Sequence, residues 1–239
     1  MWSSKGILAT TLYDANASMK IISIRVPKTA SSSFGEILKQ VYPRIGAPWN
    51  KFMALDLHDP KSEWYHCRGA FKARWYAEIK KACCNLDVVH GHTPVELWDG
   101  LFPEAKRICW LRNPVSFIIS GYFFAKNLRH ISPNMTIWDY VELPYRRNWQ
   151  TMYTGGDLSR FFFVGKQENF ANDVKDLAMT LRWKRFAIPK LNISVSNAYT
   201  RAKGELLSDR EFINHVKFNH ADDVALYKSI VRYPKGRMI

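Results

Sequence analysis

Hydrophobic and polar positions follow one pattern twice along the chain: a short apolar run, a polar turn, and then apolar residues at helical spacing. The first run covers residues 21–26, has the character of a strand and stops at Pro27. Apolar residues then recur at i, i+3, i+4 and i+7, which defines one helix face. These helix positions are Phe34, Ile37, Leu38 and Val41. The pattern predicts a strand, a turn and a helix in direct succession.

A second unit of this kind occupies residues 108–127. Its apolar strand ends at Arg112, and Asn113 and Pro114 follow, a strong N-cap residue and a residue suited to the first helical turn. Its apolar helix positions are Val115, Ile118, Ile119, Tyr122 and Phe123. In a parallel sheet, both helix starts lie at the carboxyl edge, where open α/β sheets bind ligands. The two units therefore predict two anion-binding helix starts at one edge.

The rest of the chain adds fewer elements. The apolar segment 86–89 predicts another strand, and residues 209–230 predict one or two helices packed on the sheet. Residues 43–75 are rich in Pro, Trp and His with weak periodicity, which predicts an irregular excursion near an acceptor site. A length of 239 residues suits a single α/β domain over residues 1–239, and no internal repeat or low-complexity tract divides it.

The turn of the first unit has the chemistry of a phosphate-binding loop. It consists of Lys28, Thr29, Ala30, Ser31, Ser32 and Ser33. The first amides of a helix lack intrahelical partners and carry the positive end of its dipole, and Lys28 adds a full charge. The nucleotide-triphosphatase pattern G-x-x-x-x-G-K-[ST] is not matched, because Pro27 precedes the lysine. ATP or GTP hydrolysis is disfavoured; the simpler alternative is a surface turn whose serines cap a helix.

Two histidines, His90 and His92, flank Gly91 after the strand at 86–89. An imidazole has an ordinary pKa near ~6.5, which suits a base that accepts a proton near neutral pH. Either histidine could instead only form a hydrogen bond within the turn.

Three segments together resemble the sulfotransferases that use 3'-phosphoadenosine 5'-phosphosulfate (PAPS). RVPKTASSSF at 25–34 resembles their 5'-phosphosulfate loop, and LRNPVSFIISGYFF at 111–124 resembles their 3'-phosphate segment, with Ser120 eight residues after Arg112. VVHGHTPVELW at 88–98 is similar to a segment of heparan sulfate 2-O-sulfotransferase. Weaker matches lie at 148–156, 161–170 and 191–194. These matching segments occur in the same order as in the family and together span roughly residues 20–230.

This resemblance implies a P-loop-like three-layer fold with a central parallel sheet flanked by helices, and PAPS as the co-substrate. It implies that Lys28 stabilises the leaving 5'-phosphate oxygen, helped by residues 29–33, and that Arg25 adds a second cation there. Arg112 and Ser120 would hold the 3'-phosphate.

The resemblance also assigns the acceptor side of the reaction. It favours His92 as the base and His90 as a residue that orients acceptor or donor. Residues 190–194 would close over adenine. The expected acceptor is a hydroxyl, on a carbohydrate or a small metabolite, and no metal is expected.

The net charge of +14 indicates an anionic partner, which the donor satisfies. The basic residues are spread along the chain and no nucleic-acid-binding motif accompanies them, so nucleic acid is disfavoured as a partner.

Four cysteines without metal-binding spacing favour reduced thiols. No signal peptide or membrane-spanning run is visible, which predicts a cytoplasmic protein of microbial or viral origin unless an anchor has been removed. The oligomeric state stays open. The rival functions are a nucleotide kinase of related fold and a non-catalytic polyanion-binding module.

Overall fold

The computed structural model of the chain describes residues 20–42, 45–46, 79–81, 83, 85–189 and 197–230. The predicted excursion at 43–75, apart from residues 45–46, and the predicted adenine loop at 190–194 lie outside these ranges.

Five parallel strands form the central sheet in the order β2-β3-β1-β4-β5. The strands are β1 (Ile21–Ile24), β2 (Ile45–Gly46), β3 (Val88–Gly91), β4 (Lys106–Leu111) and β5 (Phe163–Lys166). β1, the strand of the first predicted unit, lies at the centre between β3 and β4. The strands before both polar turns are therefore direct neighbours.

Side chains alternate between the two faces of the sheet, and both faces are covered. Ile21 and Val88 belong to one hydrophobic cluster, and the next residues, Ile22 and Val89, belong to the other. Since successive side chains of a strand point to opposite faces, each face carries its own core. The three-layer α/β architecture predicted from the sequence is confirmed.

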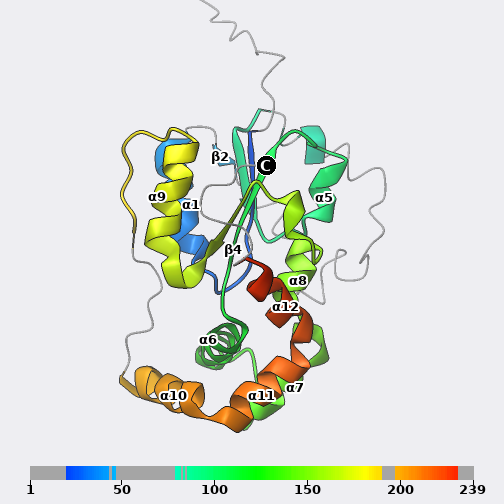
Figure 1. Ribbon diagram of the computed structural model, residues 1–239, viewed down its shortest axis with the longest axis vertical. Helices are drawn as coiled ribbons and strands as arrows, with labels where there is room; N and C mark the ends of the chain where they lie inside the picture. Colours follow the sequence, from blue (N-terminus) through cyan, green and yellow to red (C-terminus); the bar gives the residue numbers. More distant parts are fainter. Residues whose placement is uncertain are drawn as a thin grey trace, which may run out of the picture.

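Helices of the two outer layers lie to either side of the sheet in Figure 1. On one side are α1 (Ser31–Val41) and α9 (Phe170–Thr180), and on the other are α5 (Glu96–Asp99) and α8 (Trp149–Thr154). Further α-helices with bounds in the described residues are α6 (Pro114–Asn127), α7 (Ile137–Glu142), α10 (Asn197–Ser208), α11 (Arg210–Asn219) and α12 (Ala221–Ser229). Three 3-10 turns are η2 (Pro144–Arg146), η3 (Leu158–Arg160) and η4 (Gln167–Asn169).

The helices predicted at 209–230 form as α11 and α12, but most of their contacts are with helices. α11 packs on α6, α7 and α10, and α12 packs mainly on α8. Their buried residues Phe212, Val216 and Leu226 nevertheless belong to the same hydrophobic cluster as Ile22 and Val89 of the sheet. The last helices therefore extend the core of that face together with α6 (Figure 1).

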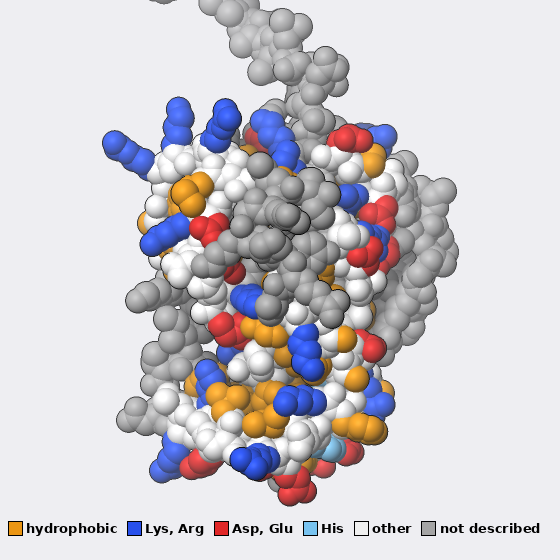
Figure 2. All heavy atoms as spheres, viewed as in Figure 1, with side chains coloured by type: hydrophobic (Ala, Val, Ile, Leu, Met, Phe, Trp, Pro, Cys, Tyr) orange, Lys and Arg blue, Asp and Glu red, His pale blue; other side chains and the backbone are white. Residues whose placement is uncertain are grey.

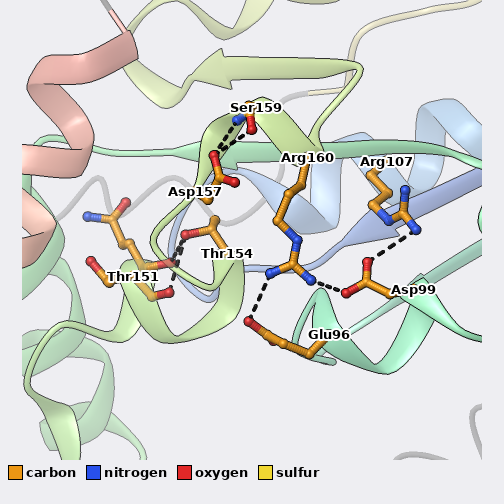
Figure 3. A network of polar contacts seen from close by, with 9 residues as sticks. Glu96, Asp99, Arg107, Thr151, Thr154, Asp157, Ser159 and Arg160 are labelled. Carbon is orange, nitrogen blue, oxygen red and sulfur yellow. Dashed lines mark hydrogen bonds and ion pairs between the residues drawn. The ribbon is translucent and has the colours of Figure 1, made fainter.

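An ion-pair network ties α5 to the sheet near the amino-terminal ends of the strands (Figure 3). Arg160 of η3 pairs with Glu96 and Asp99 of α5, and Arg107, the second residue of β4, also pairs with Asp99 at 3.3 Å. These partly exposed pairs contribute little individually, and as a network they fix α5 against β4. The network lies away from the strand ends that carry the predicted site.

Figure 2 shows Lys and Arg side chains spread over the visible face, with Asp and Glu between them, which agrees with the dispersed charge in the sequence. Hydrophobic side chains gather on the lower part of this face, over α6. Phe124 of α6 and Leu128, the residue that follows this helix, are each 48% exposed. Within the described residues, no helix has both the length and the apolar character needed to cross a membrane.

Candidate functional site

The predicted site residues lie at the carboxyl edge of neighbouring strands, and hydrogen bonds join one strand end to the next. His92, after β3, donates from Nδ1 to the Arg25 carbonyl, after β1, at 2.6 Å. Arg112, after β4, donates from Nη1 to the Lys28 carbonyl at 3.1 Å. The Asn113 amide donates to the Glu168 carboxylate, just beyond β5, at 2.8 Å. Four consecutive strand ends are thus fixed relative to one another.

The loop after β1 has an unusual backbone. Lys28 and Ala30 have φ angles of 61° and 63°, in the left-handed region that side chains other than glycine's disfavour. Each such residue costs about 1 kcal/mol or more, and strain of this kind concentrates at functional sites. Left-handed residues within a turn direct successive amides into a concave anion site. Ala30, the N-cap residue of α1, forms no capping hydrogen bond through its side chain.

The hydroxyl groups of this loop divide into two kinds. Arg25 donates to the Oγ atoms of Ser31 and Ser32, at 3.4 Å and 2.9 Å. Because those oxygens act as acceptors, each hydroxyl keeps its proton for donation to an anion. Thr29 is fully buried, and its hydroxyl donates to the Val26 carbonyl at 2.8 Å. Its hydroxyl therefore closes the turn and does not face a ligand.

Lys28 lies over an aromatic ring that the sequence did not single out. Its ammonium is 3.8 Å from the centroid of Phe124 on α6. Burial, and then the charge of Arg112, lower its pKa to about 8. Lys28 therefore joins the first predicted unit to the helix of the second.

His90 is buried beneath the first turn of α1. Its Nδ1 lies 2.8 Å from Ser23 Oγ, and its Nε2 donates to the Ser31 carbonyl at 2.9 Å. A Cβ on Gly35 would approach the His90 ring to 3.0 Å, so glycine allows the helix to lie this close. Burial, followed by the charges of Arg25 and His92, lowers the pKa of His90 to about 3. A neutral His90 thus anchors the loop to β3.

His92 offers a different ring atom to the site. A carbonyl only accepts, so the bond to Arg25 places the proton on Nδ1 and leaves the lone pair on Nε2. Burial, and then the charge of Arg25, lower the pKa of His92 to about 4, well below the ordinary value assumed from the sequence. The ring of the buried Tyr153 lies 6.3 Å away, centroid to centroid. His92 is neutral near pH 7, the state that a proton acceptor requires.

Arg112 is only 9% exposed, and its backbone is held from both sides by one amide side chain. Gln150 of α8, fully buried, accepts from the Arg112 amide at 2.7 Å and donates to the Arg112 carbonyl at 2.9 Å. The Nε of Arg112 is buried with no hydrogen-bond partner among the described residues. Tyr199 of α10 contacts the guanidinium through its side chain. A buried donor without a partner is costly, so this atom suits an anionic ligand.

The start of α6 is capped by Asn113, the residue predicted as its N-cap. The Asn113 side chain accepts from the amides of Val115 and Ser116, and the Phe117 amide bonds the Asn113 carbonyl. Pro114 has no amide proton. The amides of the first turn are thus already bonded, as expected for an Asn N-cap, and the Arg112 side chain is the donor that this unit presents. Ser120 lies half-buried on the same helix, ~9 Å along its axis from Pro114.

Sequence reasoning missed the residues that support the site from elsewhere in the chain. They are Phe124, Gln150, Tyr153, Glu168 and Tyr199. A signal existed for four of them, because they fall in segments that match the family: Phe124 in 111–124, Gln150 and Tyr153 in 148–156, and Glu168 in 161–170.

Comparison with known proteins agrees with the motifs. A segment of 124 residues is 26% identical to sulfotransferase 2A1 from Homo sapiens. The chain resembles the sulfotransferases. The family resemblance predicted from the motifs is confirmed, whereas the finer one to heparan sulfate 2-O-sulfotransferase stays a prediction. The match covers 51% of this chain and 40% of the human protein.

A solved structure of a sulfotransferase from Alicyclobacillus acidocaldarius aligns with a TM-score of 0.48 and 17% identity, over 90% of this chain and 96% of that one. No family model matches the sequence. In the part of the chain that the structure describes, no group of three or more His, Cys, Asp or Glu side chains could hold a metal ion.

Proposed function

We propose that the protein transfers the sulfuryl group of PAPS to a hydroxyl acceptor. The observation that carries the proposal is the pairing of two cationic sites at one sheet edge: the Lys28 loop and the buried Arg112, joined by a bond of 3.1 Å. PAPS carries a phosphosulfate and a separate 3'-phosphate, so it needs two such sites. Two features fit this donor: the N-cap residue of α1 has no capping side chain, and the Nε of Arg112 has no hydrogen-bond partner among the described residues.

The phosphosulfate would bind at the loop after β1. Amides of the loop, the hydroxyls of Ser31 and Ser32, and the Arg25 guanidinium provide donors there, and Lys28 provides the charge. The 3'-phosphate would bind Arg112 together with Ser120, which distinguishes PAPS from AMP or ATP.

In the reaction, the acceptor oxygen forms a bond to sulfur as the bond between sulfur and the 5'-phosphate oxygen breaks. In-line displacement through a loose transition state is expected by analogy with phosphoryl transfer. Negative charge grows on the departing oxygen, and Lys28 stabilises it. His92 takes the acceptor proton on Nε2, and 3',5'-diphosphoadenosine leaves.

Donor binding would also change the pKa of the proposed base, His92. Burial, and after it the charge of Arg25, holds the pKa of His92 low, and an anion bound to Arg25 offsets the second of these causes. The pKa of His92 would then be higher in the donor complex than in the free protein, which makes the residue a stronger base once PAPS is bound. His90, with both ring nitrogens engaged, holds the loop in place.

We propose a carbohydrate hydroxyl as the acceptor, because segment 88–98 resembles the heparan sulfate enzyme. Calorimetry should give 3',5'-diphosphoadenosine an affinity at least about tenfold above that of AMP, since each further charged hydrogen bond adds roughly 1.5 kcal/mol or more. Labelled PAPS should transfer its sulfuryl group within a panel of glycans, phenols and lipids. Equal affinities would contradict the 3'-phosphate assignment.

The same experiments test the two rivals. Preferential binding of ATP with magnesium-dependent phosphoryl transfer would indicate a kinase. Tight donor binding without transfer to any member of the acceptor panel would indicate a binding module.

A further inference from the structure

One face of α12 carries two side chains whose hydrogen bonds lead toward the same pair of residues, Arg112 and Asn113. Asp223 and Tyr227 are four residues apart, so they lie on one face of the helix, a turn apart. Each bonds a different neighbouring element, and both paths end at the strand end that carries Arg112.

The first path runs through α8. Asp223 is 1% exposed and accepts from the Thr151 amide at 2.7 Å, the Thr151 hydroxyl at 2.8 Å and the Gln150 amide at 3.3 Å. The side chain of Asn148, the residue before α8, does not cap that helix. Asp223 therefore supplies the cap from a distant part of the chain and fixes α8, from which Gln150 bonds the Arg112 amide and carbonyl.

The second path runs through η4. The Tyr227 hydroxyl donates to one carboxylate oxygen of Glu168 at 2.9 Å. The other oxygen of that carboxylate accepts from the Asn113 amide at 2.8 Å. Two consecutive amides, those of Arg112 and Asn113, are thus held by side chains that α12 in turn holds.

The structure assigns α12 as a positioning element of the donor site: Asp223 and Tyr227 fix the backbone that directs the Arg112 guanidinium toward the 3'-phosphate. This assignment rests on the proposed function for the identity of the ligand. The placement of the backbone itself rests only on the hydrogen bonds above. α12 is therefore predicted to control the preference for a 3'-phosphorylated nucleotide without touching that nucleotide.

Because burying Asp223 has a desolvation cost, an effect on the stability of the fold can be distinguished from an effect on the position of α8. Burial raises the pKa of Asp223 to about 6, so its ionised form is disfavoured in the fold. An asparagine removes that desolvation cost, but it leaves one oxygen for three donors and presents an amide where an oxygen accepted. The free energy of unfolding can then change little while α8 shifts.

The experiment compares Asp223→Asn and Tyr227→Phe with the unaltered full chain by calorimetry. In the unaltered chain, the ratio of the AMP dissociation constant to that of 3',5'-diphosphoadenosine measures recognition of the 3'-phosphate. We expect this ratio to fall about tenfold in either variant, with AMP affinity unchanged within about twofold, because the loop after β1 is left intact.

Two matched substitutions serve as controls. Asp222→Asn changes the neighbouring carboxylate of α12, which is exposed and bonds only the Asn148 side chain among the described residues. Tyr145→Phe removes an exposed hydroxyl that has no hydrogen-bond partner in the described part of the chain. Both controls should keep the ratio of the unaltered chain.

Hydrogen exchange of the nucleotide-free proteins provides a second measurement that does not depend on the donor. The amides of residues 112 and 113 should exchange faster in both test variants than in both controls. Unchanged exchange would overturn the assignment, as would a lower melting temperature with an unchanged ratio. If the unaltered chain binds both nucleotides equally, the proposed function fails, and the exchange rates still decide whether α12 positions Arg112.

Discussion

The two strand–turn–helix units look alike in sequence and differ in how their turns are built. After β1, Lys28 and Ala30 adopt left-handed backbone angles, and the N-cap residue Ala30 has no side chain that caps α1. After β4, Asn113 caps α6, and Gln150 holds the strand end. An uncapped helix start can bind an anion through its backbone, whereas a capped one provides a rigid base for a side chain. We infer that the first unit serves the reacting group and the second serves recognition.

The sharpest test of this division is Lys28→Ala in the first unit. The substitution should lower kcat by about 10³-fold, because it removes the charge closest to the leaving oxygen in a partly buried site. Since the Lys28 carbonyl, not its side chain, bonds Arg112, donor affinity should change far less. Steady-state kinetics with labelled PAPS and calorimetry measure the two effects.

Lys39→Ala is the matched control for Lys28→Ala. Lys39 lies in the last turn of the same helix, is exposed and pairs with Glu36 at 2.6 Å. Its loss should leave kcat unchanged. A Lys28→Ala protein that turns over normally would remove the first unit from the chemistry.

Among the described residues, His92 forms its hydrogen bond with the first unit, so its loss should affect turnover without affecting recognition. His92→Asn places an amide donor where Nδ1 bonds the Arg25 carbonyl and removes the basic nitrogen. We expect kcat to fall by about 10²-fold at unchanged donor affinity. His215→Asn, at a half-buried histidine whose Nε2 lies 3.4 Å from a Glu142 carboxylate oxygen, is the control. If His90→Ala alone reproduces the loss, the base is His90.

The pH profile tests the same base in two states. The pKa of His92 is lowered to about 4 in the free protein, so the acid limb of kcat/KM for the donor should lie below pH 5. With donor bound, the limb of kcat should move to higher pH, because the donor's charge offsets that of Arg25. If the acid limb of kcat lies at the same pH as that of kcat/KM, or at a lower pH, the proposed coupling between donor binding and the pKa of His92 is contradicted.

A substitution in the second unit should have the opposite effect and change the recognition of the nucleotide. Arg112→Lys keeps a charge but loses the donor to the Lys28 carbonyl and the buried Nε. The affinity for 3',5'-diphosphoadenosine should fall about thirtyfold, which corresponds to ~2 kcal/mol, while that for AMP is retained. Arg107→Lys, at the other end of β4, is the control. Equal losses for both nucleotides would show that Arg112 does not discriminate them.

Local sequence rules predicted the two units, the parallel sheet and the common edge, because strand periodicity, Pro27 and Asn113 act within a few residues. They did not predict the partners of Arg112 and Asn113, because Gln150 and Glu168 are 38 and 55 residues distant in the chain. The left-handed angles of Lys28 and Ala30 have no local signal, since neither is glycine. The low pKa of His92 follows from burial, which appears only once the layers have packed.

The smallest expected effect tests the backbone difference itself. Ala30→Gly should raise the free energy of unfolding by about 0.5 kcal/mol, because glycine adopts the left-handed angle without strain and this gain exceeds its entropy cost. Asn113→Ala should lower it by about 1 kcal/mol, because two amides lose their cap. Urea unfolding of the two variants measures the sign of the change in the free energy of unfolding for each. Two destabilised variants would mean that the loop after β1 is not held in the left-handed form, and the contrast between an open and a capped helix start would then be lost.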